Sequence, residues 1–157
     1  MQIWLGRHAE AESLEQAASD ADRKLTETGR RQTAQLARWL AEHEPLPDLI
    51  LHSPLVRARE TAEILHSEWG AKMALERDQQ LAPGLDCGRL LSSLSARGAE
   101  GIVCIGHQPD IGRCLAEMLG GGGFSIPPGL LAAIEFPQVA MPGGGRLRWM
   151  VNPAWFA

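Results

Sequence analysis

Long apolar runs are absent from this 157-residue chain, although 45% of its residues are hydrophobic. No run approaches the roughly 20 apolar residues that a membrane-spanning helix needs, so we expect no membrane partner. An excess of basic residues is also absent, because the formal net charge at pH 7 is −4. A general nucleic-acid binder needs a concentrated basic face to neutralise phosphates, so nucleic acid is not the expected partner.

Cysteines are few, and their spacing lacks the pattern of a zinc site or a disulfide framework. Cys87, Cys104 and Cys114 are odd in number, lie far apart and include no Cys-x-x-Cys pair. This usage predicts reduced cysteines that act as small apolar residues. No signal peptide is evident before the first apolar segment. Together these features predict a cytoplasmic protein.

Carboxylate clusters with metal-ligand spacing are absent as well, which argues against magnesium-dependent chemistry and predicts no metal site. No internal repeat or long linker divides the sequence. The length therefore predicts a single domain, 1–157, with a full core.

What the chain does contain is an alternation of apolar strand-like segments with amphipathic helical segments. Thr26, Ser53 (followed by Pro54) and Asp110 are the predicted N-caps of three helices. Alternation of this kind predicts an α/β fold with a largely parallel sheet and an antiparallel pair at the end. The predicted strands are 1–6, 48–52, 72–75, 101–106, 130–136 and 146–151, and the predicted helices are 27–44, one starting at 53–54, 88–97 and 110–119.

Arginine and histidine side chains follow three of the predicted strands. Arg7 and His8 follow the first, Arg57 lies in the first turn of the helix after the second, and His107 follows 101–106. The carboxyl ends of parallel strands meet at one edge of a sheet, so we expect these side chains to converge. Arginine forks and helix N-termini favour a tetrahedral phosphate as the guest.

The imidazoles point to chemistry as well as binding. A neutral imidazole nitrogen is a competent nucleophile toward phosphorus when its other nitrogen is held by a hydrogen bond. His8 is the better candidate, because it directly follows a strand beside Arg7, and His107 would then stabilise charge on the phosphoryl oxygens. Phosphoryl transfer depends mostly on positioning and charge neutralisation, so this set predicts a phosphatase that needs no metal.

Four motifs cover about the first 120 residues: LGRHAE at 5–10, LTETGRRQ at 25–32, HSPLVRARETA at 52–62 and IGHQP at 105–109. In their residues and their order these motifs resemble the histidine phosphatase superfamily. The short segment between Thr61 and Ile102 makes the chain similar to the SixA-type phosphohistidine phosphatases in particular, and leaves no room for a sizeable lid.

The resemblance implies a fold and a role for each matching residue. The fold would be the three-layer α/β/α arrangement of phosphoglycerate mutase-like proteins, with a mostly parallel mixed sheet. His8 would be the phosphate-accepting nucleophile, flanked by Arg7. Arg57 would be the second phosphate-binding arginine and His107 the second catalytic histidine, and Arg23 matches a family arginine near the phosphate pocket.

The chain departs from the family pattern at three places. Ala9 replaces the usual glycine after the nucleophile, which would cost about 1 kcal/mol if that position needs a positive φ. His52 stands where a serine is common. Larger relatives that cleave phosphoesters carry a Glu or Asp after a leucine, where this chain has Leu81 and then Ala-Pro-Gly.

The missing acid bears on the substrate. An alkoxide leaving group needs a positioned proton donor, whereas an imidazole is far less basic and can leave already protonated near neutral pH. We therefore expect a phosphohistidine protein as substrate, such as a histidine phosphotransfer domain in signal transduction. Two alternatives stay open: a phosphatase of small phosphomonoesters, and a phosphate-binding module without catalysis. Carboxylates that remain candidates for the acid are Glu10, Asp20, Asp22, Glu76, Asp78 and Asp86.

Overall fold

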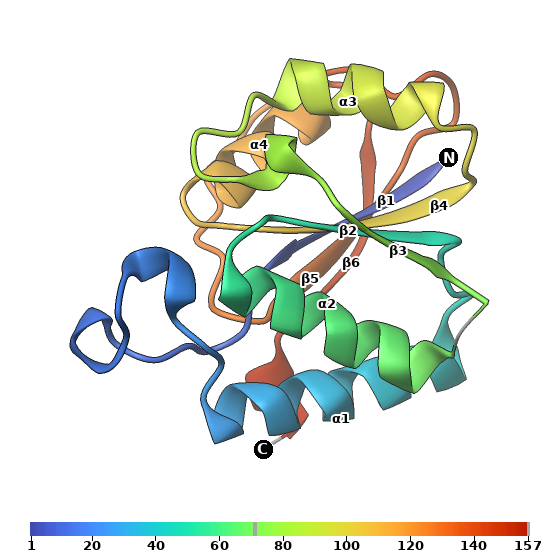
Figure 1. The fold of residues 1–157 in the computed structure, drawn as a ribbon. Coiled ribbons are helices and arrows are strands. Elements are labelled where there is room, and N and C mark those ends of the chain that lie inside the picture. The colour runs from blue at the N-terminus through green and yellow to red at the C-terminus, as the bar shows by residue number, and fades with distance from the viewer. Residues whose placement is uncertain (71, 157) are drawn as a thin grey trace.

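The computed structural model describes residues 1–70 and 72–156, and these form one six-stranded sheet with helices on both faces (Figure 1). The strand order is β3-β2-β4-β1-β5-β6. The first four strands run parallel, whereas β5 is antiparallel to β1 and to β6. The predicted α/β/α fold with a mostly parallel mixed sheet is therefore confirmed. The strands are β1 (Gln2–Arg7), β2 (Leu49–His52), β3 (Ala74–Arg77), β4 (Gly101–Gly106), β5 (Leu131–Glu135) and β6 (Arg146–Val151).

Two helices cover each face of the sheet. On one face lie α1 (Glu27–His43) and α2 (Val56–Trp69), and on the other lie α3 (Cys87–Ala96) and α4 (Asp110–Leu119), as Figure 1 shows. The last turn, η4 (Pro153–Phe156), packs on α1. None of the helices in the described residues is both long and apolar enough to cross a membrane.

The core is divided by the sheet into two clusters, and β1 shows why. Its side chains alternate between the faces, so that Ile3 and Leu5 pack toward α3 and α4 while Trp4 packs toward α1 and α2. All three are fully buried. The Trp4 ring meets the rings of Trp69 and Trp149 edge-on, with centroids 5.6 and 4.7 Å apart, a favoured aromatic geometry. β1 is thus packed on both of its faces, and its C-terminal end carries the first candidate residues.

One of the three predicted helix caps is confirmed, and two are wrong. The Thr26 hydroxyl accepts a hydrogen bond from the Gly29 N–H at 3.0 Å. Ser53 caps no helix, because α2 starts at Val56 and the Ser53 hydroxyl faces a histidine instead. Asp110 already lies within α4, and its carboxylate accepts from the Gly84 N–H at 2.7 Å. The short strand predicted at 72–75 lies two residues later, as β3.

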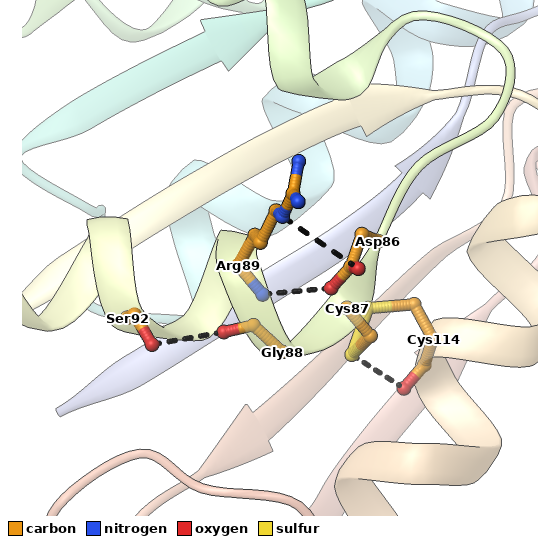
Figure 2. Close-up of a disulfide and its surroundings, with 6 residues drawn as sticks. All are labelled: Asp86, Cys87, Gly88, Arg89, Ser92 and Cys114. Atoms are coloured by element: carbon orange, nitrogen blue, oxygen red, sulfur yellow. Dashed lines mark hydrogen bonds and ion pairs between the residues drawn. A yellow bond between two sulfur atoms is a disulfide. The ribbon is translucent and has the colours of Figure 1, made fainter.

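The prediction of reduced, unpaired cysteines is wrong for two of the three. Cys87 at the start of α3 and Cys114 in α4 form a disulfide (Figure 2), with Cα atoms 5.1 Å apart, and only Cys104 is free and buried. Distance along the sequence misled the prediction, because α3 and α4 pack side by side on the same face of the sheet. In the chain-entropy model, a bond that closes a loop of 27 residues lowers the conformational entropy of the unfolded chain. This loss stabilises the folded protein by about 3.5 kcal/mol.

The segment between β1 and α1 is an exposed loop. It contains two short 3-10 turns, η1 (Leu14–Gln16) and η2 (Asp20–Asp22), and its two ends are tied together by a bridge between Ala11 and Leu25. In Figure 1 this loop projects beyond the body of the molecule on one side of the sheet. Its turn η2 contacts α2, which brings loop residues to the helix that carries Arg57.

Candidate active site

The candidate site lies where three adjacent parallel strands end. β2, β4 and β1 are neighbours in the sheet, and their ends are in register, with Arg7 opposite Gly106 and His52 opposite Ile105. His8 and His107 therefore leave the sheet side by side, with ring centroids 5.2 Å apart. Both are buried.

The hydrogen bonds of His8 determine which of its ring nitrogens is free to react. Its Nδ1 lies 2.7 Å from the Ala9 carbonyl oxygen, which can only accept, so Nδ1 carries the hydrogen. Nε2 then keeps its lone pair, and it accepts a hydrogen bond from Arg57 Nε at 3.1 Å. The two contacts agree on one tautomer. They present Nε2 as a nucleophile and place the guanidinium of Arg57 against it.

Electrostatics keeps this imidazole neutral. Burial lowers the pKa of His8 to about 3, and the neighbouring His107, Arg57 and Arg7 act in the same direction, while the bond to the Ala9 carbonyl opposes them. A positive charge would be desolvated and surrounded by cations, so the uncharged ring is favoured at neutral pH. Only the neutral form has a nucleophilic lone pair.

His107 is oriented by Ser53, a residue whose role the sequence did not reveal. The Ser53 hydroxyl oxygen accepts from the Leu55 N–H at 3.3 Å and lies 2.7 Å from His107 Nε2. The hydroxyl hydrogen can point to Nε2, and when the hydroxyl donates in this way the hydrogen of a neutral ring lies on Nδ1. Nδ1 is buried and has no hydrogen-bond partner in the described part of the chain. Burial lowers the pKa of His107 to about 4.

Arg7 presents an unused donor in the same place. Its Nη1 donates to the Ile126 carbonyl at 3.0 Å, whereas its Nε is buried without a partner among the residues that the structure describes. Burial, together with the charges of Arg23 and Arg57, lowers the pKa of Arg7. Buried donors normally find acceptors, so a cluster of cations with an unused donor favours an anion as the guest.

Thr61 is a second residue that the sequence did not single out. Its hydroxyl oxygen accepts from the Ala9 N–H at 3.0 Å and donates to the Arg57 carbonyl at 2.7 Å, so it links the segment after His8 to the first turn of α2. The strain considered for Ala9 does not arise, because no described residue other than glycine has a positive φ.

Arg23 lies in the exposed loop, and the carboxylate of Asp20 connects it to Arg57. Its Nε donates to the Glu12 carbonyl at 2.5 Å and its Nη1 to Asp20 Oδ1 at 3.0 Å. Asp20 in turn accepts from both terminal nitrogens of Arg57, at its carbonyl oxygen (2.5 Å) and at Oδ2 (3.1 Å). A hydrogen bond from Arg23, helped by that from Arg57, lowers the pKa of Asp20.

The other candidate acids are engaged elsewhere. Glu10 accepts from the Thr26 hydroxyl, Asp22 from the Ser19 hydroxyl, and Asp86 caps α3. The remaining two, Glu76 and Asp78, both pair with Arg97. The backbone oxygen of Leu81, the residue before the missing acid, lies close to Gly106, just before His107. His52 is buried, and its Nδ1 is bound to the Ser53 carbonyl oxygen at 2.8 Å.

Comparison with known proteins adds an independent result. Residues 3–82 match the model of the histidine phosphatase superfamily (branch 1). The phosphohistidine phosphatase SixA of Escherichia coli is 30% identical over 157 residues, which cover 98% of this chain and 94% of that protein. The solved structure of the protein histidine phosphatase SixA complexed with tungstate superposes with a TM-score of 0.89 at 27% identity, and covers both chains fully. The alpha-ribazole phosphatase of Shigella flexneri shares the fold, with a TM-score of 0.73 at 19% identity over 98% of this chain and 97% of the other.

Proposed function

Because the chain belongs to the histidine phosphatase superfamily (branch 1), we propose that it is a phosphohistidine protein phosphatase that acts through a phosphorylated His8. The observation that carries the proposal is the tautomer of His8. Nδ1–H is held by the Ala9 carbonyl, and the lone pair of Nε2 faces the guanidinium that would bind the phosphoryl group.

The proposed reaction has two displacements at phosphorus. In the first, His8 Nε2 bonds to phosphorus as the P–N bond to the substrate imidazole breaks, and the electron pair goes to the leaving nitrogen; a substrate ring that is protonated on its other nitrogen leaves as neutral imidazole. In the second, the oxygen of a water molecule bonds to phosphorus as the P–N bond to His8 breaks, Nε2 regains its electron pair, and the hydrogens of the water leave with the inorganic phosphate. Arg7 and Arg57 neutralise the phosphoryl oxygens, and the unpartnered Nδ1 of His107 supplies a further donor.

The surroundings of the candidate acids support a substrate whose leaving group needs no strong acid. Asp20 is the one candidate carboxylate that touches an arginine of the site, and the lowered pKa keeps it ionised. An ionised carboxylate cannot donate a proton to an alkoxide, whereas imidazole leaves without such help. The likeness to the SixA protein of Escherichia coli supports the same substrate class.

The proposed partner is a folded protein that presents phosphohistidine, such as a histidine phosphotransfer domain. Between α2 and β4 the described residues form β3, a short turn and α3, and these add no large lid over the strand ends. The proposal includes a cytoplasmic location and a role in signal transduction. The Cys87–Cys114 bond does not itself favour this location, because disulfides are rare in the reducing cytoplasm.

A dephosphorylation panel tests the proposal. The wild type is compared on a phosphohistidine protein, a phosphoserine protein and a sugar phosphate, all with chelator present. We expect the phosphohistidine protein to have the highest kcat/KM, and acid-labile phosphate to be trapped on His8. His8→Ala should abolish both turnover and trapping, while His43→Ala, on the exposed side of α1, should retain them.

Each alternative has its own signature in this panel. A preference for the sugar phosphate would replace the substrate class and keep the site. Phosphate binding without turnover on any of the three substrates would indicate a binding module. Appreciable residual activity of His8→Ala would refute the mechanism itself.

A further inference from the structure

The exposed loop carries a carboxylate that contacts both Arg57 and Arg23. Asp20 is the first residue of η2, a single short turn, and its side chain is 55% exposed. Its partner Arg57 is only 6% exposed. A buried guanidinium beside the nucleophile is therefore anchored by a loop residue far away in the sequence.

The way in which Arg57 is held leaves one of its edges free. A guanidinium is a planar fork, in which Nε and Nη2 share one edge and Nη1 and Nη2 form the end. Asp20 takes the end, with its carbonyl oxygen on Nη1 and Oδ2 on Nη2. The Nε edge faces His8, because Nε donates to Nε2. A phosphoryl group on Nε2 would thus meet Nε and the second hydrogen of Nη2 side by side.

We infer that Asp20 is a positioning residue that orients Arg57 toward the phosphoryl group, and that Arg23 acts through Asp20 and not on the phosphate directly. Arg23 Nη1 holds Asp20 Oδ1, while the Nε of Arg23 is fixed on the Glu12 carbonyl. The carboxylate therefore bridges two guanidinium groups. The inference rests on the proposed function in taking phosphoryl transfer through His8 as the reaction.

This arrangement makes a prediction different from that of a direct phosphate ligand. If Arg23 bound the phosphate itself, losing Arg23 and losing Asp20 would impair the reaction independently, and their effects would multiply. If Arg23 works through Asp20, the second substitution adds little once the first has been made. A double-mutant cycle separates the two cases.

The experiment compares the wild type with Asp20→Asn, Arg23→Gln and the double variant on the phosphohistidine protein. Asp22→Asn is the matched control, because Asp22 lies on the same turn and accepts from the Ser19 hydroxyl, not from either arginine. We expect Asp20→Asn to lower kcat by about tenfold to hundredfold, the range for a lost charge-assisted hydrogen bond, with a smaller change in KM. Asp22→Asn should stay within about twofold of the wild type.

Three outcomes decide the inference. A double variant no slower than Asp20→Asn alone supports it, provided that all variants show the thermal unfolding transition of the wild type. Multiplicative losses would overturn it and make Arg23 a direct ligand. Tighter binding of inorganic phosphate to Asp20→Asn, measured by calorimetry, together with an increased kcat/KM, would also overturn it, because Asp20 would then be a competitor that the phosphate displaces. Failure of the proposed function is distinct, since the wild type itself would then be inactive.

Discussion

The protein should lose stability as the pH falls, because His8 and His107 are buried as neutral rings. The size of the loss follows from the pKa values of the two histidines. The pKa is about 3 for His8 and about 4 for His107, against an ordinary value of 6.5. Because the folded-state values lie below those of the unfolded chain, the unfolded chain binds more protons between pH 6.5 and these values. The stability contributed by the neutral rings is therefore present above pH 6.5 and is lost as the pH decreases through this range.

The magnitude follows from the fraction of protonated histidine in each state. At about pH 5 both rings are almost wholly neutral in the folded protein, while histidine in the unfolded chain is mostly protonated. Lowering the pH from about 7 to about 5 should then cost about 2 kcal/mol for each histidine, or about 4 kcal/mol for the pair. Domains of this size are stable by only about 5–15 kcal/mol, so the effect is large enough to measure.

Urea unfolding at the two pH values is the assay, with wild type, His8→Gln, His107→Gln and His43→Gln. Each substitution in the site should reduce the difference in unfolding free energy between the two pH values by about 2 kcal/mol. His43→Gln, which removes an imidazole from the exposed side of α1, should leave the wild-type difference in place. Equal pH differences for His8→Gln and the wild type would refute the view that His8 is held neutral by its surroundings.

Two further substitutions test individual contacts. Ser53→Ala should lower kcat by about tenfold, because it removes the hydroxyl that holds His107 Nε2. An unchanged kcat would contradict the orienting role of Ser53, and so would an unchanged tautomer of the His107 ring in nitrogen NMR. Gly29→Ala should destabilise the protein by about 1–3 kcal/mol in urea unfolding, because a Cβ there would lie 2.3 Å from the Glu10 carbonyl oxygen. Gly88→Ala is the matched control, since its Cβ would have ordinary contacts and alanine favours a helix; equal destabilisation of both variants would disprove the packing argument.

The elements and the strand-end residues could be predicted because their signals are local. The buried run of β4 and the capped start of α1 depend on neighbours in the sequence, and the parallel arrangement then brings His8 and His107 to one edge. The departure at Ala9 could not be evaluated in the same way. Whether it causes strain depends on its φ, and the structure places Ala9 outside the left-handed region.

Long-range pairings account for the predictions that failed. Ser53 before a proline is typical of a helix cap, but its hydroxyl is used 54 positions away by His107. The pairing of Cys87 with Cys114 likewise depends on α3 and α4 lying next to each other, which helical periodicity does not encode. Asp20 was one of six equivalent carboxylates in the sequence, and only the folded loop distinguishes it.

The charges around the strand ends connect phosphate binding to the choice of leaving group. A site that binds a phosphoryl dianion gathers cations, here Arg7 and Arg57 with Arg23 behind them. A carboxylate placed among them has a lowered pKa, as Asp20 has. It therefore stays ionised and has no proton to donate. A general acid would need the opposite surroundings, apolar or acidic, to keep its proton at neutral pH. The same arginines that suit this site to phosphate therefore disfavour Asp20 as an acid, which supports a substrate whose leaving imidazole requires little assistance.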